Sequence, residues 1–406
     1  MNKKRFPGSL VLLLSCLLPV CGQQEGKPDP PLPDPLVNFD PSTFVRFQSA
    51  HGAEARRLRL IEYLWQAKSL PATQPDSRPL TRDVFGGPLS GIDPLHSRTV
   101  RELICKMSPF DFTATCYLVE SNQFNRNNRR LVIVHSGHRQ GKEIAEGVDA
   151  TVEKMLSLGF QVLVVDMPLV GWNRDRTFRV PGSDNRPKTI TLSQRGTGGH
   201  NEMFRQLASP RLPDGTVFRF FVEPVIQGIN YFQQSTPQAI DVSMVGLSGG
   251  GWATHFCAAI DRRIRYSFPV AGALPLYARK FSPGSWGDRE QFYAPLYGEQ
   301  DTNGDGVADR ASGVASWLEI FVLGSIGNGS LRKTGAVGRY QLQILNFSDP
   351  CCFSTGIYRT YDRWVAGTSR RLGGRWSLFS DRSHQQHIIS TAAIGKITST
   401  LMEKKP

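Results

Sequence analysis

The feature that most constrains the fold is a glycine-rich turn between a strand and a helix. Residues 242–245 (Val-Ser-Met-Val) have the apolar character of a buried strand, and a helix is expected over residues 250–259. The five residues 246–250 (Gly-Leu-Ser-Gly-Gly) connect the two. Small residues are needed where a strand and a helix approach this closely, and the serine backbone in such a turn is strained. The pattern predicts a sharp turn that exposes the Ser248 hydroxyl.

Short apolar strands alternate with helical segments from residue 131 onward. Strands that are apolar throughout are typical of a parallel sheet with both faces covered by helices. We therefore predict an α/β fold with a mostly parallel central sheet. The last expected helix has a capping-box start at Ser383. The expected strands are 131–134, 160–165, 241–245, 266–270, 340–345 and 376–379, and the expected helices are 50–67, 142–157, 217–234, 250–259 and 385–402.

A β-hairpin is expected before the parallel region. Residues 100–106 and 112–119 have strand character and flank the turn at 108–111. With the turn centred there, Cys105 falls opposite Cys116. A cross-strand disulfide is the preferred interpretation in an oxidising compartment, and two buried thiols are the alternative.

The N-terminus resembles an export signal. Three basic residues among the first five precede an apolar run at residues 10–20. This run is too short to cross a bilayer core of about 30 Å, which favours a signal peptide over a membrane anchor. We expect residues 1–22 to be removed before Gln23. The alternative is a lipobox that ends at Cys16, which would attach a lipid there. The protein is thus expected in the periplasm or outside the cell, bound to a membrane only through such a lipid.

The remaining chain divides into a tether and one folded domain. Residues 23–49 contain a Pro- and Asp-rich stretch, which predicts an extended linker. Residues 50–406 form the expected domain. Within it, residues 168–215 are rich in Gly, Pro, Arg and Asn, and we interpret them as a cap or lid insertion.

The formal net charge of +13 does not by itself indicate a nucleic-acid partner. Such a charge can attract nucleic acid or an anionic surface. However, the basic residues are scattered, and no recognised nucleic-acid-binding module is visible. We interpret the charge as a solvated basic surface and expect no nucleic-acid partner. The oligomeric state is left open.

A serine hydroxyl needs a base to become a nucleophile, and the base needs an orienting carboxylate. After a turn of this kind the chain order is serine, then acid, then histidine. Two histidines, His384 and His387, follow the last expected strand, where the base is expected. His387 is the preferred base and His384 is the alternative. The preferred acid is Asp349, just after the strand 340–345, and the fallbacks are Asp362 and Asp381.

An oxyanion hole is also expected near the serine. One backbone donor is Gly249, which follows the nucleophile, and a second is Gly137 or His138 in the loop after the strand 131–134. His135 and His138 can alternatively be read as metal ligands, but no third ligand is spaced nearby.

A separate acidic loop resembles a calcium site. Residues 301–309 place oxygen ligands at positions 1, 3, 5 and 9 and a glycine at position 6, but Ser312 stands where an EF-hand has its final acid. Two interpretations of this loop stay open, a structural Ca²⁺ site and a solvated acidic turn. The ligands would be Asp301, Asn303, Asp305 and Asp309.

Taken together, these motifs resemble the α/β-hydrolase family from about Val100 to the C-terminus. The resemblance implies the α/β-hydrolase fold and a Ser-His-Asp hydrolase that needs no organic cofactor, most similar to esterases. The first hypothesis is therefore an exported carboxylic-ester hydrolase acting on acylated polysaccharide or small esters. The second is a serine peptidase or amidase of the same fold. The third is a non-catalytic surface-binding protein stabilised by calcium.

Overall fold

The computed structural model describes residues 28–403 with gaps. The omitted positions inside this range are 109, 125–129, 140, 142, 183–185, 208–211, 236–240, 283–286, 328–337 and 354–355. The expected signal peptide at residues 1–22 and the expected lipid site at Cys16 lie outside the described residues. The chain separates into the units Met1–Pro30 and Pro31–Pro406. The second unit contains every element below.

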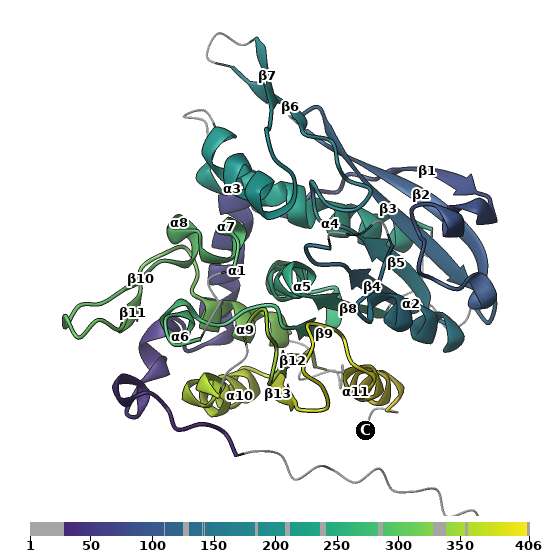
Figure 1. Cartoon of the computed structure of the whole chain (residues 1–406). Helices are drawn as coiled ribbons and strands as arrows, with labels where there is room; N and C mark the ends of the chain where they lie inside the picture. The colour runs from purple at the N-terminus through teal and green to yellow at the C-terminus, as the bar shows by residue number, and fades with distance from the viewer. Residues whose placement is uncertain are drawn as a thin grey trace, which may run out of the picture. The chain divides into compact units, whose positions relative to one another are not determined.

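A mixed nine-stranded sheet organises the fold, with strand order β1-β2-β3-β5-β4-β8-β9-β12-β13 (Figure 1). β1, β2, β3 and β5 pair antiparallel in that order, and every pairing from β5 to β13 is parallel. This confirms the predicted mostly parallel sheet with a preceding hairpin. The strands are β1 (Asp76–Leu80), β2 (Ser97–Met107), β3 (Phe112–Ser121), β4 (Arg130–His135), β5 (Gln161–Val165), β8 (Asp241–Leu247), β9 (Ile264–Val270), β12 (Tyr340–Asn346) and β13 (Arg375–Asp381).

Helices cover both faces of this sheet, because the central strands are apolar on both sides. Residues 131–134 of β4 and 162–165 of β5 are fully buried. One hydrophobic core includes side chains of α1 (Ala50–Trp65), α4 (Arg219–Gln234), α5 (Gly249–Ile260), α9 (Trp317–Ser325) and α10 (Asp362–Arg371). The other includes side chains of α2 (Val148–Ser157) and α11 (Thr391–Met402). Figure 1 shows α2 and α11 on one side of the strands and α5 and α9 on the other.

No helix of the described chain combines the length and the hydropathy needed to span a membrane. Shorter elements complete the described chain. These elements are η1 (Asp34–Leu36), η2 (Pro41–Phe44), η3 (Arg82–Gly86), η4 (Pro94–His96), β6 (Thr177–Pro181), β7 (Pro187–Thr191), α3 (Gly196–Gln206), η5 (Asp214–Phe218), α6 (Leu276–Arg279), α7 (Arg289–Phe292), α8 (Ala294–Tyr297), β10 (Glu299–Gln300), β11 (Arg310–Ala311) and η7 (Ile357–Thr360).

The predicted linker at residues 23–49 is wrong over its second half. Leu36 and Phe44 are buried in the main hydrophobic core. The Arg46 guanidinium also forms an ion pair of 2.7 Å with the buried carboxylate of Glu319 on α9. Apolar side chains within a Pro-rich segment therefore dock it onto the domain, and the unit boundary follows Pro30 rather than residue 49.

The predicted disulfide between Cys105 and Cys116 is also wrong. The hairpin forms, but Met107 pairs with Phe112, so Cys105 lies opposite Ala114 and Cys116 opposite Leu103. The strands meet the expected turn at Met107 and Phe112, and a turn centred there places Ala114, two residues before Cys116, opposite Cys105. Both cysteines are free and buried. A hydrogen bond with Cys116, reinforced by burial, raises the pKa of the Cys105 thiol well above its ordinary value.

The segment 168–215, predicted as a cap or lid, forms an insertion between β5 and α4. It contains the two-stranded hairpin β6–β7 and the helix α3. Figure 1 shows this hairpin projecting away from the central strands. The insertion brings a buried histidine, His200 on α3, into contact with the loop after β4.

The closing helix begins later than predicted, at Thr391 instead of residue 385. Its N-cap is Ser390, whose side chain accepts a hydrogen bond from the amide of Ala393. The expected cap at Ser383 has another function: its amide and hydroxyl both donate to Asp381. Residues 382–390 are consequently a loop at the end of β13, and both candidate histidines lie in it.

Candidate active site

Ser248 occupies a strained turn between β8 and α5. Its backbone angles are φ 57° and ψ −120°, a conformation that residues other than glycine seldom adopt. Two hydrogen bonds hold it there. The Ser248 amide donates to the carbonyl of Val270 on β9, and its carbonyl accepts from the amide of Trp252 in α5, each at 2.9 Å. The neighbouring strand and the helix together impose the strain expected of a nucleophile elbow.

These positions of the turn require glycine, because other backbone atoms lie against them. A Cβ at Gly246 would overlap the carbonyl of Gly250, and one at Gly250 would overlap the carbonyl of His135. The sequence requirement for small residues therefore has a direct steric cause. It lets the turn pack between α5 and the end of β4.

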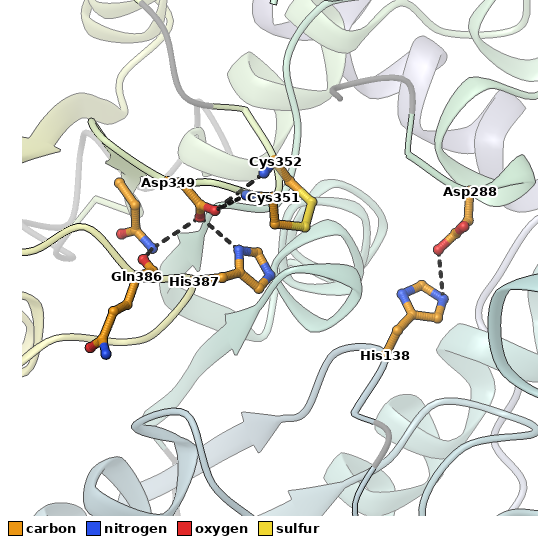
Figure 2. Close-up of a disulfide and its surroundings, with 8 residues drawn as sticks. His138, Asp288, Asp349, Cys351, Cys352, Gln386 and His387 are labelled. Carbon is orange, nitrogen blue, oxygen red and sulfur yellow. Dashed lines mark hydrogen bonds and ion pairs between the residues drawn. A yellow bond between two sulfur atoms is a disulfide. The ribbon is translucent and has the colours of Figure 1, made fainter. Parts of the chain in front are cut away.

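Asp349 and His387 come together after the ends of two adjacent parallel strands. Asp349 follows β12 and His387 follows β13, and Asp349 Oδ2 lies 2.6 Å from His387 Nδ1 (Figure 2). The other carboxylate oxygen, Oδ1, accepts the amides of Cys351 at 2.8 Å and Cys352 at 3.2 Å. An ionised carboxylate only accepts hydrogen bonds, so Nδ1 carries the hydrogen when the imidazole is neutral. The His387 Nε2 lone pair is then available to take a proton.

The Nε2 atom of His387 is buried and has no hydrogen-bond partner within the described chain. The ring as a whole remains accessible, with 18% of its side-chain surface exposed, while the Asp349 side chain is fully buried. Asn346 steadies this loop, since its amide donates to the carbonyl of Ile388 at 2.9 Å. The arrangement is that of a base oriented by a buried acid.

The alternative base, His384, has a weaker partner. Its Nε2 lies 3.4 Å from Asp381 Oδ2, and its Nδ1 accepts the amide of Gln386. The Asp381 carboxylate is already engaged by the hydroxyls of Ser383 and Ser390. The geometry therefore favours the pair Asp349 and His387. The remaining fallback acid, Asp362, begins α10 and accepts the amide of Arg363.

The loop after β4 lies directly against the Ser248 turn. A Cβ on Gly137 would come within 2.7 Å of the Ser248 Cβ and 3.2 Å of the Gly249 nitrogen. A Cβ on Gly249 would in turn lie 2.9 Å from Cε1 of His138. The three residues predicted to form the oxyanion hole thus lie next to one another and next to the serine.

The comparisons with known proteins agree with this topology. No protein-family model matches the chain, and no curated protein matches its sequence. Among solved structures, acetyl xylan esterase 1 from Thermoanaerobacterium sp. JW/SL YS485 aligns with a TM-score of 0.52 at 12% identity, over 92% of this chain and 98% of that one. An acetyl xylan esterase from Paenibacillus sp. R4 aligns with the same score, identity and coverage of this chain, over 99% of its own.

The chain has the α/β-hydrolase fold. At 12% identity this likeness concerns the fold only. Within the α/β-hydrolase fold of this chain, the serine turn follows β8, and the candidate acid and base follow β12 and β13. The predicted fold class is confirmed.

A basic cleft lies beside the candidate oxyanion loop of this α/β-hydrolase fold. Its volume is about 460 Å³. It lies between the loop after β4 and the inserted segment. Residues that line it include His138, Arg139, Gly171, Arg174, Arg195 and Gly198. Arg139 pairs with the buried carboxylate of Asp166 at 2.6 Å, so its charge is largely compensated, whereas Arg174 and Arg195 add positive charge to the wall.

Sequence reasoning missed a group of four side chains around His138, here called the His-Asp-Glu cluster. Its members are His138, His200, Asp288 and Glu290. No third ligand stands near His135 and His138 in the sequence, because the partners of His138 come from α3 and from the start of α7. His135 itself is not part of the cluster: its Nδ1 contacts the carbonyl of Ser136, and burial lowers its pKa to about 4.

The electrostatics of the His-Asp-Glu cluster are strongly perturbed. Burial disfavours a charged imidazole, but interactions with the carboxylates of Asp288 and Glu290 outweigh it and raise the pKa of His138 to about 10. Burial likewise disfavours the Glu290 carboxylate, but its interactions with the imidazoles of His200 and His138 hold its pKa well below the usual range. The four groups therefore form a polar unit beside the serine turn, with His200 and Glu290 buried and His138 and Asp288 partly exposed.

A disulfide between neighbouring residues, Cys351 and Cys352, adjoins the Asp349–His387 pair (Figure 2). The two sulfur atoms and one ring nitrogen of His387 lie within 4.8 Å of one another. The same two residues supply the amides that hold Asp349. No sequence pattern indicated this bond.

The predicted calcium ligands lie in the exposed loop between β10 and β11. The carboxylate of Asp301 accepts the amides of Gly304 and Gly306, and that of Asp309 accepts the amide of Thr302. The Asn303 side-chain amide donates to Asp305. Two groups of three or more metal-ligating His, Cys, Asp or Glu residues come together in the described chain, and neither includes this loop. Calcium binding by the loop stays a prediction.

Proposed function

We propose that the protein is an exported serine hydrolase that cleaves carboxylic esters with Ser248, His387 and Asp349. The observation that carries this proposal is the 2.6 Å contact between Asp349 and His387, in a fold whose strained turn presents Ser248. The contact fixes the tautomer that leaves Nε2 of His387 free to act as a base. The export part rests on the N-terminal sequence.

In the proposed mechanism the Ser248 hydroxyl oxygen attacks the ester carbonyl carbon while His387 Nε2 takes the hydroxyl proton. Asp349 holds the Nδ1 hydrogen and stabilises the imidazolium. The oxyanion accepts hydrogen bonds from the Gly249 amide and from the amide of Gly137 or His138. The intermediate then expels the alcohol, which receives the proton from His387. Water, activated by the same histidine, hydrolyses the acyl-enzyme.

The proposed substrates are acylated polysaccharides or small esters. Two solved structures of this fold with nearly complete mutual coverage are acetyl xylan esterases, which favours an acetylated sugar as the first substrate to test. An ester is favoured over an amide on the same ground. Rates for p-nitrophenyl esters of increasing chain length, acetylated sugars and matched anilides would separate an esterase from a peptidase or amidase.

A fluorophosphonate probe tests the catalytic proposal. We expect it to label the folded wild-type protein and the Ser399→Ala variant, which alters an exposed serine on α11. It should not label Ser248→Ala. Failure to label the folded wild-type protein would overturn the proposal and favour a non-catalytic binding protein.

A further inference from the structure

The His-Asp-Glu cluster joins three separate parts of the chain. His138 lies in the loop after β4, His200 on α3 of the insertion, and Asp288 and Glu290 at the start of α7. One ligand-type atom from each residue lies within 4.8 Å of the other three. Figure 2 shows His138 pointing toward Asp288 and away from the Asp349–His387 pair. The proposed mechanism uses no side chain of this cluster.

The separations between these atoms suit a common metal ion. His138 Nε2 lies 2.8 Å from His200 Nδ1, 2.9 Å from Asp288 Oδ2 and 3.3 Å from Glu290 Oε1. His200 Nδ1 lies 3.4 Å from Glu290 Oε1. Bonds of about 2.0–2.1 Å to a tetrahedral zinc ion place neighbouring ligand atoms about 3.3 Å apart. Small movements of the side chains would therefore complete the tetrahedron.

The second ring nitrogen of His200 fixes the orientation that a metal ligand needs. Its Nε2 lies 2.7 Å from the carbonyl oxygen of Pro168, which can only accept a hydrogen bond. Nε2 therefore carries a hydrogen, and in a neutral ring the Nδ1 lone pair points into the cluster. Histidines that bind metals commonly donate their other N–H to a carbonyl or carboxylate in this way.

Glu290 supplies an independent indication of a cation. Its side chain is fully buried, and neither carboxylate oxygen has a hydrogen-bond partner in the described chain. The imidazole nitrogens of His138 and His200 are its near polar neighbours, at 3.3 and 3.4 Å. A buried carboxylate without hydrogen bonds is costly unless a positive charge compensates it, either an imidazolium or a metal ion. A divalent cation between the four residues supplies that charge.

We propose that His138, His200, Asp288 and Glu290 bind one zinc ion with a structural role. Mixed imidazole and carboxylate ligands in a compact four-atom arrangement suit Zn²⁺. Because the protein supplies all four ligands, no position stays open for substrate or water, which distinguishes a structural site from a catalytic one. The ion would fasten the candidate oxyanion loop to the insertion, since His138 follows Gly137 in that loop and His200 lies on α3 of the insertion.

Metal content tests this proposal. After equilibration with zinc and dialysis against metal-free buffer, the wild-type protein should retain one zinc per chain by mass spectrometry. Ser248→Ala should retain the same amount, which separates this proposal from the catalytic one. The double variant Asp288→Asn/Glu290→Gln should retain less than a tenth of it. Asp305→Asn, in the exposed acidic loop, should retain it fully.

Thermal unfolding and cobalt spectroscopy complete the test. A chelator should lower the Tm of the wild-type protein and leave that of the double variant unchanged. Cobalt(II) substitution of the wild-type protein should give the intense visible absorption of a tetrahedral site, a readout that does not depend on the folding of any variant. Absence of bound zinc and of this absorption would overturn the proposal and identify His138 as an imidazolium held by two carboxylates.

Discussion

At the scale of single residues, the carboxylate partner of each histidine distinguishes the two candidate bases. His387 has a short contact to a carboxylate whose other oxygen is fixed by two amides, whereas His384 lies 3.4 Å from an aspartate already engaged by serine hydroxyls. The two histidines are three positions apart, yet only one has the environment of an oriented base.

This difference predicts unequal effects of two matched substitutions. His387→Ala should lower kcat at least about 10³-fold, because removing one member of a catalytic triad disables the unit. His384→Ala should change kcat by less than about tenfold, since its partners in the described structure are Asp381 and the Gln386 amide and not the candidate acid Asp349. Ester hydrolysis by the two purified variants gives the comparison. Equal losses, or a larger loss for His384→Ala, would contradict the assignment.

The glycines of the serine turn make a second residue-scale prediction. Gly250→Ala places a Cβ against the carbonyl of His135 and should destabilise the protein by about 1–3 kcal/mol, the usual cost of overpacking. Gly395→Ala is the control: no atom lies near its added Cβ, and it should stabilise α11 by about 0.5–1 kcal/mol. Urea unfolding measures both. The steric account fails if Gly250→Ala is neutral.

At the scale of elements, the loop after β12 is constrained by the disulfide between Cys351 and Cys352. Its two residues donate the amides that fix Asp349 Oδ1, and its sulfurs pack near His387. The bond therefore limits the freedom of the backbone that orients the acid.

Breaking this bond should lower kcat while leaving KM nearly unchanged. Losing one oriented hydrogen bond, worth about 1 kcal/mol, corresponds to about a fivefold loss of rate. We expect this loss in Cys351→Ser/Cys352→Ser and in reduced wild-type protein. Reductant should have no further effect on the double variant. If the double variant keeps the full wild-type rate, the disulfide does not support Asp349.

Elements with a local signal could be predicted from the sequence, and those set by distant contacts could not. The serine turn and its flanking strand and helix depend on adjacent residues, so their pattern is visible. The edge strand β1 was missed because Pro79 interrupts it, and its pairing with β2 is a tertiary contact. The hairpin register, the docking of residues 34–47 and the His-Asp-Glu cluster likewise depend on contacts between residues far apart in the chain.

At the scale of the whole molecule, two buried neutral histidines make the fold sensitive to acid. Burial lowers the pKa of His135 to about 4 and that of His255 to about 3. His255 Nδ1 faces the amide oxygen of Gln341 at 2.9 Å, and its Nε2 is buried without a hydrogen-bond partner in the described chain. Both folded-state values lie below the unfolded value of about 6.5. The unfolded chain therefore binds protons that the folded chain does not.

Stability contributed by these histidines is present above pH 6.5 and is lost as the pH falls toward 4 and then 3. When the pH falls from 7 to 5, each of the two histidines should lower the free energy of unfolding by about 2 kcal/mol. His255→Asn keeps a donor for Gln341, and it should reduce the pH dependence over this range by that amount. His51→Asn, on the exposed surface of α1, should leave it unchanged. Urea unfolding at both pH values decides, and an unaltered dependence in His255→Asn would contradict the account.

The central claim is that Ser248 is a nucleophile activated by His387. Tandem mass spectrometry of the protein treated with a fluorophosphonate locates the adduct directly. The account predicts a single modified serine, Ser248, in the wild-type protein, and at least a hundredfold slower modification in His387→Ala at unchanged folding. An adduct on any other residue, or an equal rate of modification in His387→Ala, would contradict it.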